Sequence, residues 1–503
     1  MNGTVGGTSV AGTVTASGLY TAPAVPTPSA VTLTATSQAD PTSSGSAKVT
    51  IGPYNLSNQY SFTGLDDGAA PTTALVQGSN GHFYGTAALG GTNGNGTVFR
   101  LDSSGSIATL HAFSSSDGSF PYTSFFEGSN GFFYGITQWG GANNQGTIFK
   151  IGSSGNLTTV YSFTGGSDGG QPTGLIEAED GYLYGTTWAG GISNRGTVFR
   201  LDLSGNLQTL YSFSGGADGA GPDAPLVQAT GGYFYGTTEN GGDLLCQIWP
   251  GAGCGTIFRI DSTGTLVTLH SFSGGSDGAN PALGALIQAG DGSFYGTTWF
   301  GGNPSCVVST NGYTGCGTIF KMDSAGQVTT LHQFSGGVEG GVPVAALLQG
   351  SDGDFYGVTT AGGDSSCRVV SSSTNYSAYI GCGTVFKMDT AGNVNALYSF
   401  SGSPTDASNP FAALISGTDG YFYGTTRWGG TNTSCSYTNN GGCGTIFRLW
   451  GPGGPLRPAP SSRKSKKPVQ APVLSPTNVN PRLAPADNST GPSKNRLNPA
   501  GRD

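Results

Sequence analysis

The feature that most constrains this chain is a short phrase that recurs seven times. GTVFRLDSSG occupies residues 96–105, and closely similar phrases begin at residues 146, 196, 255, 317, 383 and 444. The seventh copy, GTIFRLWGPG, keeps the start of the phrase and loses its end. One unit of this size cannot enclose a core alone, so each copy must bury its apolar residues against other copies. The chain therefore predicts a repeat assembly.

Each copy can be divided into four short strands. In the first copy these are PTTALVQ, the FYGTA phrase, the GTVFRLD phrase and ATLHAF, and Asn80-Gly81 marks a tight hairpin between the first two. The residue equivalent to Tyr84 recurs at intervals of 50 to 67 residues: Tyr134, Tyr184, Tyr235, Tyr295, Tyr356 and Tyr423. Four strands in a period of this length are typical of a β-propeller blade.

The two ends of the repeat region predict how the ring closes. The last copy stops after its third strand, at GTIFRLW, whereas residues 54–62 (YNLSNQYSF) form an unpaired fourth strand before the first copy. Joining them completes a seventh blade and removes the exposed sheet edges that a solenoid would have to cap. The predicted fold is all-β, with a seven-bladed β-propeller over residues 54–450.

The amino-acid composition supports an all-β fold and argues against some classes of binding partner. Glycine is abundant, at 89 of 503 residues, and no apolar run approaches the ~20 residues of a membrane-spanning helix. Residues 1–450 carry 11 basic and 26 acidic residues, a balance that repels nucleic acid. Residues 451–503 are proline-rich, with nine Lys/Arg and two Asp, and are predicted to be a disordered tail.

The repeat unit resembles the GloVer-type tandem repeat through its D-G, F-Y-G-T-T, G-G and G-T-[VI]-F-[KR] elements. That resemblance implies an exported, repeat-built β-structure, and it implies no settled activity. Residues 1–53 resemble the C-terminal half of a bacterial immunoglobulin-like domain through GLYTAP and VTLTATS, with strands at VTLTAT and AKVTI. Because only half of that domain is present, we expect a truncated reading frame, and the lack of a signal peptide does not argue against export.

The cysteines predict four local disulfides. All eight lie in the loops between the second and third strands of the last four copies, one pair to each loop. The pairs are Cys246 with Cys254, Cys306 with Cys316, Cys367 with Cys382, and Cys435 with Cys443. Each bridge would stabilise its long loop by roughly 2–4 kcal/mol. Zinc is disfavoured because CxxC spacing and accompanying histidines are missing. Disulfides indicate an oxidising compartment, so we expect an extracellular or cell-surface protein.

Acidic residues recur in the crossovers that lead to the next blade. They are Asp67, Asp117, Asp168, Asp218, Asp277, Glu339 and Asp406. They could hold calcium, the one cofactor left open, or they could form turns by bonding their own backbone, which is the favoured reading. In the fourth strand, three copies carry histidine where others carry tyrosine: His111, His270 and His332. A position that accepts either residue is expected to pack, with a polar tip, rather than bind a metal.

Positions where the copies differ are better candidates for function. Two adjacent columns follow the FYGTT phrase and contain four of the six tryptophans. The candidate ligand-binding residues in these columns are Gln138, Trp139, Trp188, Trp299, Arg427 and Trp428. Aromatic rings beside amide and charged groups suit a sugar, which stacks on the ring and bonds through its hydroxyls. The alternative is that the tryptophans fill gaps between blades.

Three functions follow from these columns. The first is an exported, monomeric propeller that binds a polysaccharide, a cell-surface glycan or another surface partner through its loops. The second is a polysaccharide-cleaving enzyme, which needs two carboxyl groups roughly 5–10 Å apart. The candidate catalytic pair for a glycoside hydrolase is Glu239 with Asp218 or Asp277. A lyase is less favoured because the acidic residues of positions 1–450 would repel a polyanionic substrate. The third is a structural spacer or adhesin. Nucleophile-elbow, P-loop and dinucleotide motifs are lacking.

Overall fold

The computed structural model describes the side chains of residues 54–451, apart from short gaps, and the backbone of five strands before Tyr54. The gaps are residue 123, residue 247, residues 249–250, residue 282, residues 307–313, residues 370–378, residues 433–434 and residues 436–440, and residues 368, 369 and 379 are described by their backbone alone. Residues 452–503, which are all of the predicted tail (residues 451–503) except its first residue, lie outside the described part of the chain.

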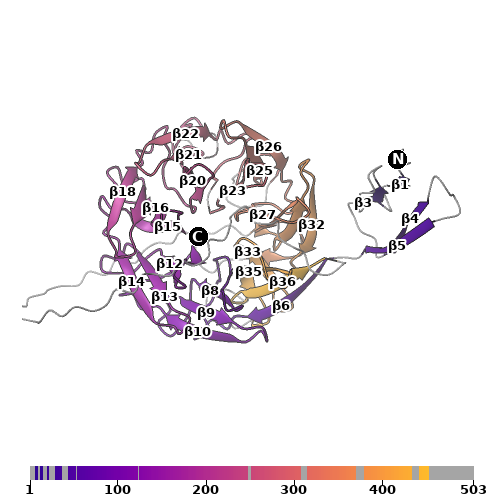
Figure 1. Cartoon of the computed structure of the whole chain (residues 1–503), viewed down its shortest axis with the longest axis horizontal. Helices are drawn as coiled ribbons and strands as arrows, with labels where there is room; N and C mark the ends of the chain where they lie inside the picture. The colour runs from indigo at the N-terminus through magenta and orange to yellow at the C-terminus, as the bar shows by residue number, and fades with distance from the viewer. Residues whose placement is uncertain are drawn as a thin grey trace, which may run out of the picture.

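Seven antiparallel sheets stand around a common axis and form a closed ring (Figure 1). The first blade contains β7 (Val76–Gln77), β8 (Phe83–Ala87), β9 (Thr97–Leu101) and β10 (Ile107–Ala112). Blade 2 contains β11 (Phe125–Glu127), β12 (Phe133–Thr137), β13 (Thr147–Ile151) and β14 (Leu157–Ser162). Blade 3 contains β15 (Gly170–Glu177), β16 (Leu183–Ala189), β17 (Thr197–Leu201) and β18 (Leu207–Ser212).

The next three blades repeat this order. Blade 4 contains β19 (Val227–Gln228), β20 (Phe234–Thr238), β21 (Thr256–Ile260) and β22 (Leu266–Ser271). Blade 5 contains β23 (Ile287–Gln288), β24 (Phe294–Thr298), β25 (Thr318–Met322) and β26 (Val328–Gln333). Blade 6 contains β27 (Leu348–Gln349), β28 (Phe355–Thr359), β31 (Thr384–Met388) and β32 (Val394–Ser399). A small hairpin, β29 (Arg368–Val369) with β30 (Tyr379–Ile380), extends a loop of blade 6.

The seventh blade closes the ring as the sequence predicts. It contains β33 (Ala407–Pro410), β34 (Ile415–Ser416), β35 (Phe422–Gly429) and β36 (Thr445–Trp450), and its outer strand is β6 (Asn55–Ser61). The β6–β36 register runs from Ser61 opposite Thr445 to Asn55 opposite Trp450, and the two strands lie side by side in Figure 1. The Phe62 amide extends this pairing by donating to the Gly444 carbonyl at 2.9 Å.

The inner strands are shorter than the sequence suggests. In blade 1 the first strand is only Val76–Gln77, and earlier in the chain a single isolated bridge joins Ala69 to Leu89. Pro71 lies between them and has no amide hydrogen to donate, so the ladder is interrupted there. In blade 3, β15 runs through its proline with a register shift between Pro172 and Gly174. In blade 7, β33 ends at Pro410, which is opposite Thr426.

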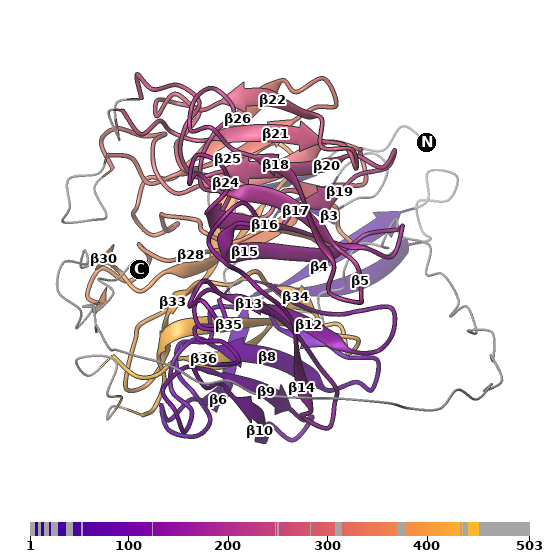
Figure 2. The same cartoon turned by 90° about the vertical axis from the view of Figure 1, so that its left-hand side faces the viewer.

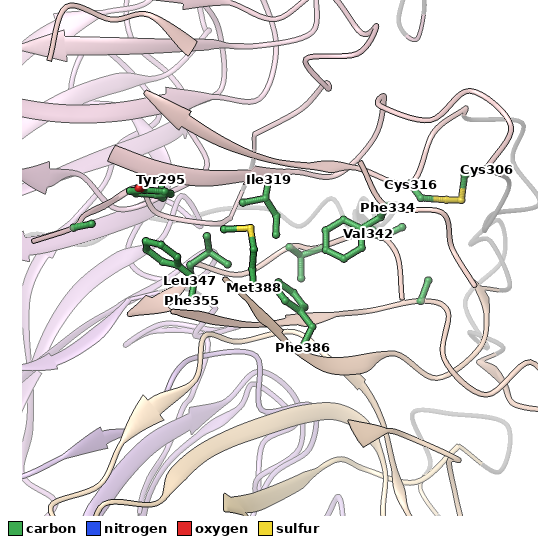
Figure 3. Close-up of a cluster of buried hydrophobic side chains, with 13 residues drawn as sticks. Tyr295, Cys306, Cys316, Ile319, Phe334, Val342, Leu347, Phe355, Phe386 and Met388 are labelled. Carbon is green, nitrogen blue, oxygen red and sulfur yellow. A yellow bond between two sulfur atoms is a disulfide. The ribbon is translucent and has the colours of Figure 1, made fainter. Parts of the chain in front are cut away.

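The core lies between neighbouring blades. The tyrosine of each FYG phrase packs on an apolar side chain of the next blade, as in Tyr84 with Phe133, whose ring centroids lie 4.1 Å apart. Figure 3 shows the equivalent layer between blades 5 and 6, where Tyr295 lies beside Phe355 at 4.2 Å. Each fully buried ring stabilises the fold by roughly 1.5–3 kcal/mol. A blade therefore buries its faces only in the presence of its neighbours.

Before the propeller, the two predicted strands are present as β4 (Ser29–Thr36) and β5 (Ser44–Ile51), and they pair antiparallel. A separate small sheet contains β1 (Gly6–Thr8), β2 (Gly12–Val14) and β3 (Tyr20–Thr21). The immunoglobulin-like assignment depends on side chains outside the described part of the chain and stays a prediction. Within the described residues, no helix is long and apolar enough to cross a membrane.

Candidate functional site

The ring has two faces with different loops. Antiparallel strands put the loops between second and third strands on the same side as the crossovers between blades, and we call this side the loop face. The first-to-second and third-to-fourth turns lie on the opposite side, the hairpin face. Figure 2 shows the ring edge-on, with β30 projecting from the loop face.

Four disulfides brace the loop face, with the pairing that the sequence predicts. They join Cys246 to Cys254, Cys306 to Cys316, Cys367 to Cys382, and Cys435 to Cys443. The sulfur atoms also lie against the following crossover: a Cβ at Gly64 would lie 2.5 Å from the Cys443 sulfur. The bridges thus fix both a loop and its neighbouring crossover. They indicate an oxidising environment, extracellular or periplasmic.

The crossover carboxylates are held within their own turns. Asp218 Oδ2 accepts hydrogen bonds from the Tyr211 hydroxyl at 3.1 Å and from the Ser214 amide at 2.7 Å. The same link between the fourth strand and the crossover occurs in every blade, with tyrosine or histidine as the partner: Tyr60–Asp67, His111–Asp117, Tyr161–Asp168, His270–Asp277, His332–Glu339 and Tyr398–Asp406. These contacts support the turn-forming interpretation. No group of three metal-binding side chains occurs among the described residues.

Burial and hydrogen bonds act on the pKa values of these pairs. Burial raises the pKa of Asp277, but hydrogen bonds from His270 and from Ser273 outweigh it and leave the pKa below its ordinary value. The pKa of Glu339 is lowered in the same way, with His332 as its partner. Where tyrosine takes the histidine's place, burial and the Asp168 carboxylate raise the pKa of Tyr161 to about 12.

A ring of left-handed residues surrounds the axis at the loop face. The residue before the proline of each inner strand has a positive φ, between 53° and 59° in every blade: Ala70, Phe120, Gln171, Gly221, Asn280, Val342 and Asn409. The amide of this residue donates a hydrogen bond to the preceding blade, as from Asn280 N to Cys254 O at 2.8 Å. Its carbonyl accepts a hydrogen bond from the residues after the FYGTT phrase, which we call the variable column, as from Trp299 N to Asn280 O at 3.1 Å. The variable column is therefore fixed at the loop-face end of the ring axis, a region that we call the channel mouth.

Glu239 is held by side chains from both neighbouring blades. The Trp188 indole nitrogen of blade 3 donates to Glu239 Oε2 at 2.6 Å, and the Asn280 amide of blade 5 donates to Oε1 at 3.5 Å. The indole lies over Gly221, where a Cβ would come within 2.8 Å of Trp188 Nε1. Trp188 and Glu239 are both half-buried. A carboxylate is thus presented at the surface beside an indole ring.

Aromatic side chains from three blades meet near the axis. The Phe411 ring of blade 7 lies 6.0 Å from Tyr122 of blade 2 and 6.5 Å from Trp299 of blade 5, between ring centroids. The Arg427 guanidinium lies over Phe411 at 5.5 Å and over Trp428 at 5.1 Å. Trp299 Nε1 is buried without a hydrogen-bond partner among the described residues. This cluster forms an aromatic floor at the channel mouth.

The predicted site residues fall into three groups. Trp188, Glu239 and Trp299 are half-buried parts of the mouth, as are Gln138 and Trp139, whose amides bond the crossover of their own blade. Arg427 and Trp428 are only 8% and 7% exposed, so packing accounts for most of their surface. Asp218 and Asp277 make no hydrogen bond or ion pair with Glu239.

Sequence comparison of the copies overlooked Gly221, Asn280, Tyr122 and Phe411. The first two occupy the left-handed position, and the other two follow the recurring proline. Both columns differ between copies, which is the same signal that identified Trp188 and Glu239. They were missed because they lie in crossovers, which the pattern marks only as turns.

A separate cavity of about 370 Å³ lies along the inner strands of blades 2 to 4. Glu127 and Glu177 line it, but both carboxylates bond the preceding blade: Glu127 accepts from the Ser79 amide and hydroxyl, each at 2.8 Å, and Glu177 accepts from the Ser129 amide at 2.7 Å and from its hydroxyl. These carboxylates join blades and are not available as a reactive pair.

The blades and their contacts define a closed propeller built from one repeat. The Gloeobacter/Verrucomicrobia repeat family matches residues 31–249, 164–371 and 306–464, and the chain belongs to this family. The GloVer-type resemblance is thereby confirmed. No curated protein sequence matches the chain.

Solved structures show distant likenesses only. A gluconolactonase from Xanthomonas campestris is 14% identical, with 60% of this chain and 86% of that chain covered and a TM-score of 0.37. A luciferin-regenerating enzyme is 11% identical, with coverage of 67% and 95% and a TM-score of 0.39. PorZ, a surface component of the type-IX secretion system of Porphyromonas gingivalis, is 13% identical, with coverage of 80% and 48% and a TM-score of 0.45. At these identities and TM-scores, the likenesses do not indicate a shared function.

Proposed function

We propose that this protein is an exported propeller that binds a neutral glycan at the mouth of its channel on the loop face. The observation that carries the proposal is the Glu239 carboxylate, which Trp188 and Asn280 hold at a half-buried position beside an indole ring. A fixed carboxylate accepts hydrogen bonds from sugar hydroxyls, and the ring offers a surface on which a sugar can stack.

Binding is favoured over cleavage by the state of the other carboxylates. Hydrolysis of a glycosidic bond needs a second carboxyl group near Glu239. The two nominated partners, Asp218 and Asp277, already accept hydrogen bonds from their own turns and from the fourth strand. For either of them to act as the second catalytic group, its turn would have to release the carboxylate.

The test is a glycan array followed by calorimetry on the purified chain. We expect Glu239→Gln and Trp188→Phe each to weaken binding of the selected glycan about tenfold, because each removes one charge-assisted hydrogen bond from the site. Glu179→Gln is the matched control, since Glu179 is an exposed carboxylate on the hairpin face. The proposal fails if the array yields no ligand, or if Glu239→Gln binds as tightly as the wild type. A reducing-sugar assay on the same glycan tests the hydrolase alternative.

A further inference from the structure

A second set of aromatic side chains lies on the opposite side of the ring. Phe132, Tyr182 and Tyr233 occupy the same position in blades 2, 3 and 4, directly after the first hairpin, and are 42%, 38% and 41% exposed. They are the exposed aromatic residues of the described propeller, and we call them the hairpin-face arc. Large rings exposed singly need no explanation, but three at equivalent places in consecutive blades form a repeated surface.

Each ring of the arc is supported by a cation from the third strand of its own blade. Lys150 Nζ lies 5.6 Å from the centre of the Phe132 ring, and the guanidinium carbon of Arg200 lies 5.2 Å from Tyr182. The guanidinium of Arg259 lies 4.5 Å from Tyr233. The hairpins are also fixed: the Phe132 amide donates to Asn130 at 3.2 Å, and the Tyr182 amide donates to Asp180 at 3.1 Å. The rings are therefore held in place before any ligand arrives.

The arc ends where the sequence changes. In blade 5 the equivalent residue is Ser293, and Lys321 bonds Asp291 at 2.8 Å instead of covering a ring at that position. In blade 6 it is Asp354, which pairs with Lys387 at 2.8 Å. Equivalent positions of the same propeller therefore exist with and without an exposed ring, so a ring can be removed from one blade or added to another to test the role of the arc.

We propose that the hairpin-face arc binds a neutral polysaccharide chain, with one sugar unit stacked on each ring. Each of the three rings contacts a cation of its own blade, so the rings offer separate platforms rather than the continuous apolar groove that a protein helix needs. Sugars expose C–H faces that stack on such rings, while Lys and Arg donate to their hydroxyls. Carboxylates on this face of the same blades outnumber the three cations, which disfavours a polyanion: Glu127, Glu177, Glu179, Asp180, Asp202 and Asp261. This proposal concerns a different face from the channel mouth and stands independently of it.

The experiment is calorimetry of the full chain with neutral oligosaccharide ladders of glucose, xylose, mannose and N-acetylglucosamine, from disaccharides to hexasaccharides. Affinity for one ladder should rise with chain length until the chain spans three rings, because each further ring adds an intramolecular contact. Tyr182→Ala should weaken the longest ligand about tenfold. Tyr182→Phe should retain binding, which separates loss of the ring from misfolding. Leu203→Ala is the matched control, because Leu203 is 41% exposed on the same face and is aliphatic.

A gain-of-function variant completes the test. Ser293→Tyr places a ring beside Lys321 in blade 5 and should raise the affinity for the longest oligosaccharide several-fold, with no effect on the disaccharide. The proposal is overturned if no ladder binds, or if affinity is independent of chain length. It is also overturned if Glu239→Gln removes the binding, which would place the ligand at the loop face. A Tyr182→Ala variant that dissociates an oligomer of this chain would make the arc a protein contact and overturn it too.

Discussion

Gly221 decides where the Trp188 indole lies. The other six left-handed positions before the prolines carry side chains, including Ala70 with φ 53°, so the backbone conformation alone does not demand glycine. In blade 4 the Trp188 indole of the preceding blade occupies the space that a Cβ at this position would fill. The glycine therefore serves the contact between Trp188 and Glu239 rather than the turn.

We predict that Gly221→Ala displaces the Trp188 indole and breaks its hydrogen bond to Glu239. The added Cβ would lie 2.8 Å from Nε1 and 3.2 Å from Cδ1, and the left-handed backbone adds a cost of about 1 kcal/mol. Tryptophan fluorescence should change, and glycan binding at the channel mouth should weaken. Gly81→Ala is the control, because Gly81 also has a positive φ but no atom within 4 Å of its Cβ position. Equal spectra for the two variants would contradict the prediction.

At this scale the sequence identified side chains but not their contacts. Trp188 and Glu239 stood out because the copies differ there, but their hydrogen bond joins two blades and cannot be read from either copy alone. The burial of Arg427 was equally hidden, since its guanidinium lies over Phe411, which comes from a different segment of blade 7. The type of each residue predicts what its side chain can do chemically, whereas the distances between side chains of different blades depend on how the blades are arranged in the ring.

The fourth strand of every blade is tied to the crossover that follows it. The tie is a polar contact between a tyrosine or histidine and a carboxylate: a hydrogen bond in six blades, as in His270 with Asp277 at 3.3 Å, and an ion pair at 3.3 Å between His332 and Glu339. The two columns were predicted separately, as packing residues and as turn formers, and the structure joins them. The strand order, hairpins and disulfides of each blade were predictable because they depend on neighbours in sequence. The ties were missed because the partners lie on two different elements.

The contacts that tie the crossover carboxylates to the fourth strands predict that the folded protein loses stability in acid. The pKa of Asp277 in the folded protein lies below that of an unfolded chain, so ionised Asp277 stabilises the fold above the unfolded pKa of about 4. That contribution is lost as the pH falls through the lower, folded pKa. Urea unfolding between neutral pH and pH ~3 should show the free energy of unfolding decreasing at the acid end.

The variant Asp277→Asn isolates this effect. It should be less stable than the wild type at neutral pH and should lose less stability on acidification, because the titrating group is gone. Asp66→Asn, which removes an exposed carboxylate, should retain the acid slope of the wild type. An unchanged acid slope in Asp277→Asn would show that the tie carries no stability.

At the scale of the whole molecule, closure depends on one strand from the far end of the chain. β6 completes the seventh blade, and Phe62, which follows it, is fully buried between blades 7 and 1, with its ring 5.2 Å from Phe99. The truncated seventh copy of the phrase predicted this arrangement because only one unpaired strand was left to fill it. The lengths of the inner strands were not predictable in the same way, since the recurring proline interrupts most ladders and spares blade 3.

Removing residues 1–62 should therefore destabilise the ring by at least several kcal/mol, because Phe62 is lost and β36 becomes an exposed edge. We expect aggregation or a lower midpoint of thermal unfolding, measured by gel filtration and calorimetry. A variant lacking only residues 1–53 should unfold like the wild type. A synthetic peptide of residues 54–62, added to the shortened chain, should restore part of the lost stability. A fully stable, monomeric chain without β6 would contradict closure as the source of stability.

The pairing of β6 with β36 also sets the order in which the molecule can be completed. A ribosome makes β6 first and Thr445–Trp450 almost four hundred residues later, so the earliest strand of the ring has to wait for the latest. Blades 1 to 6 are built from consecutive strands and can form as they emerge, whereas the seventh pairs the two ends and has the highest loop-closure cost. Ring closure therefore cannot occur before Thr445–Trp450 has been made, and any machinery that exports the chain before that point carries an open ring.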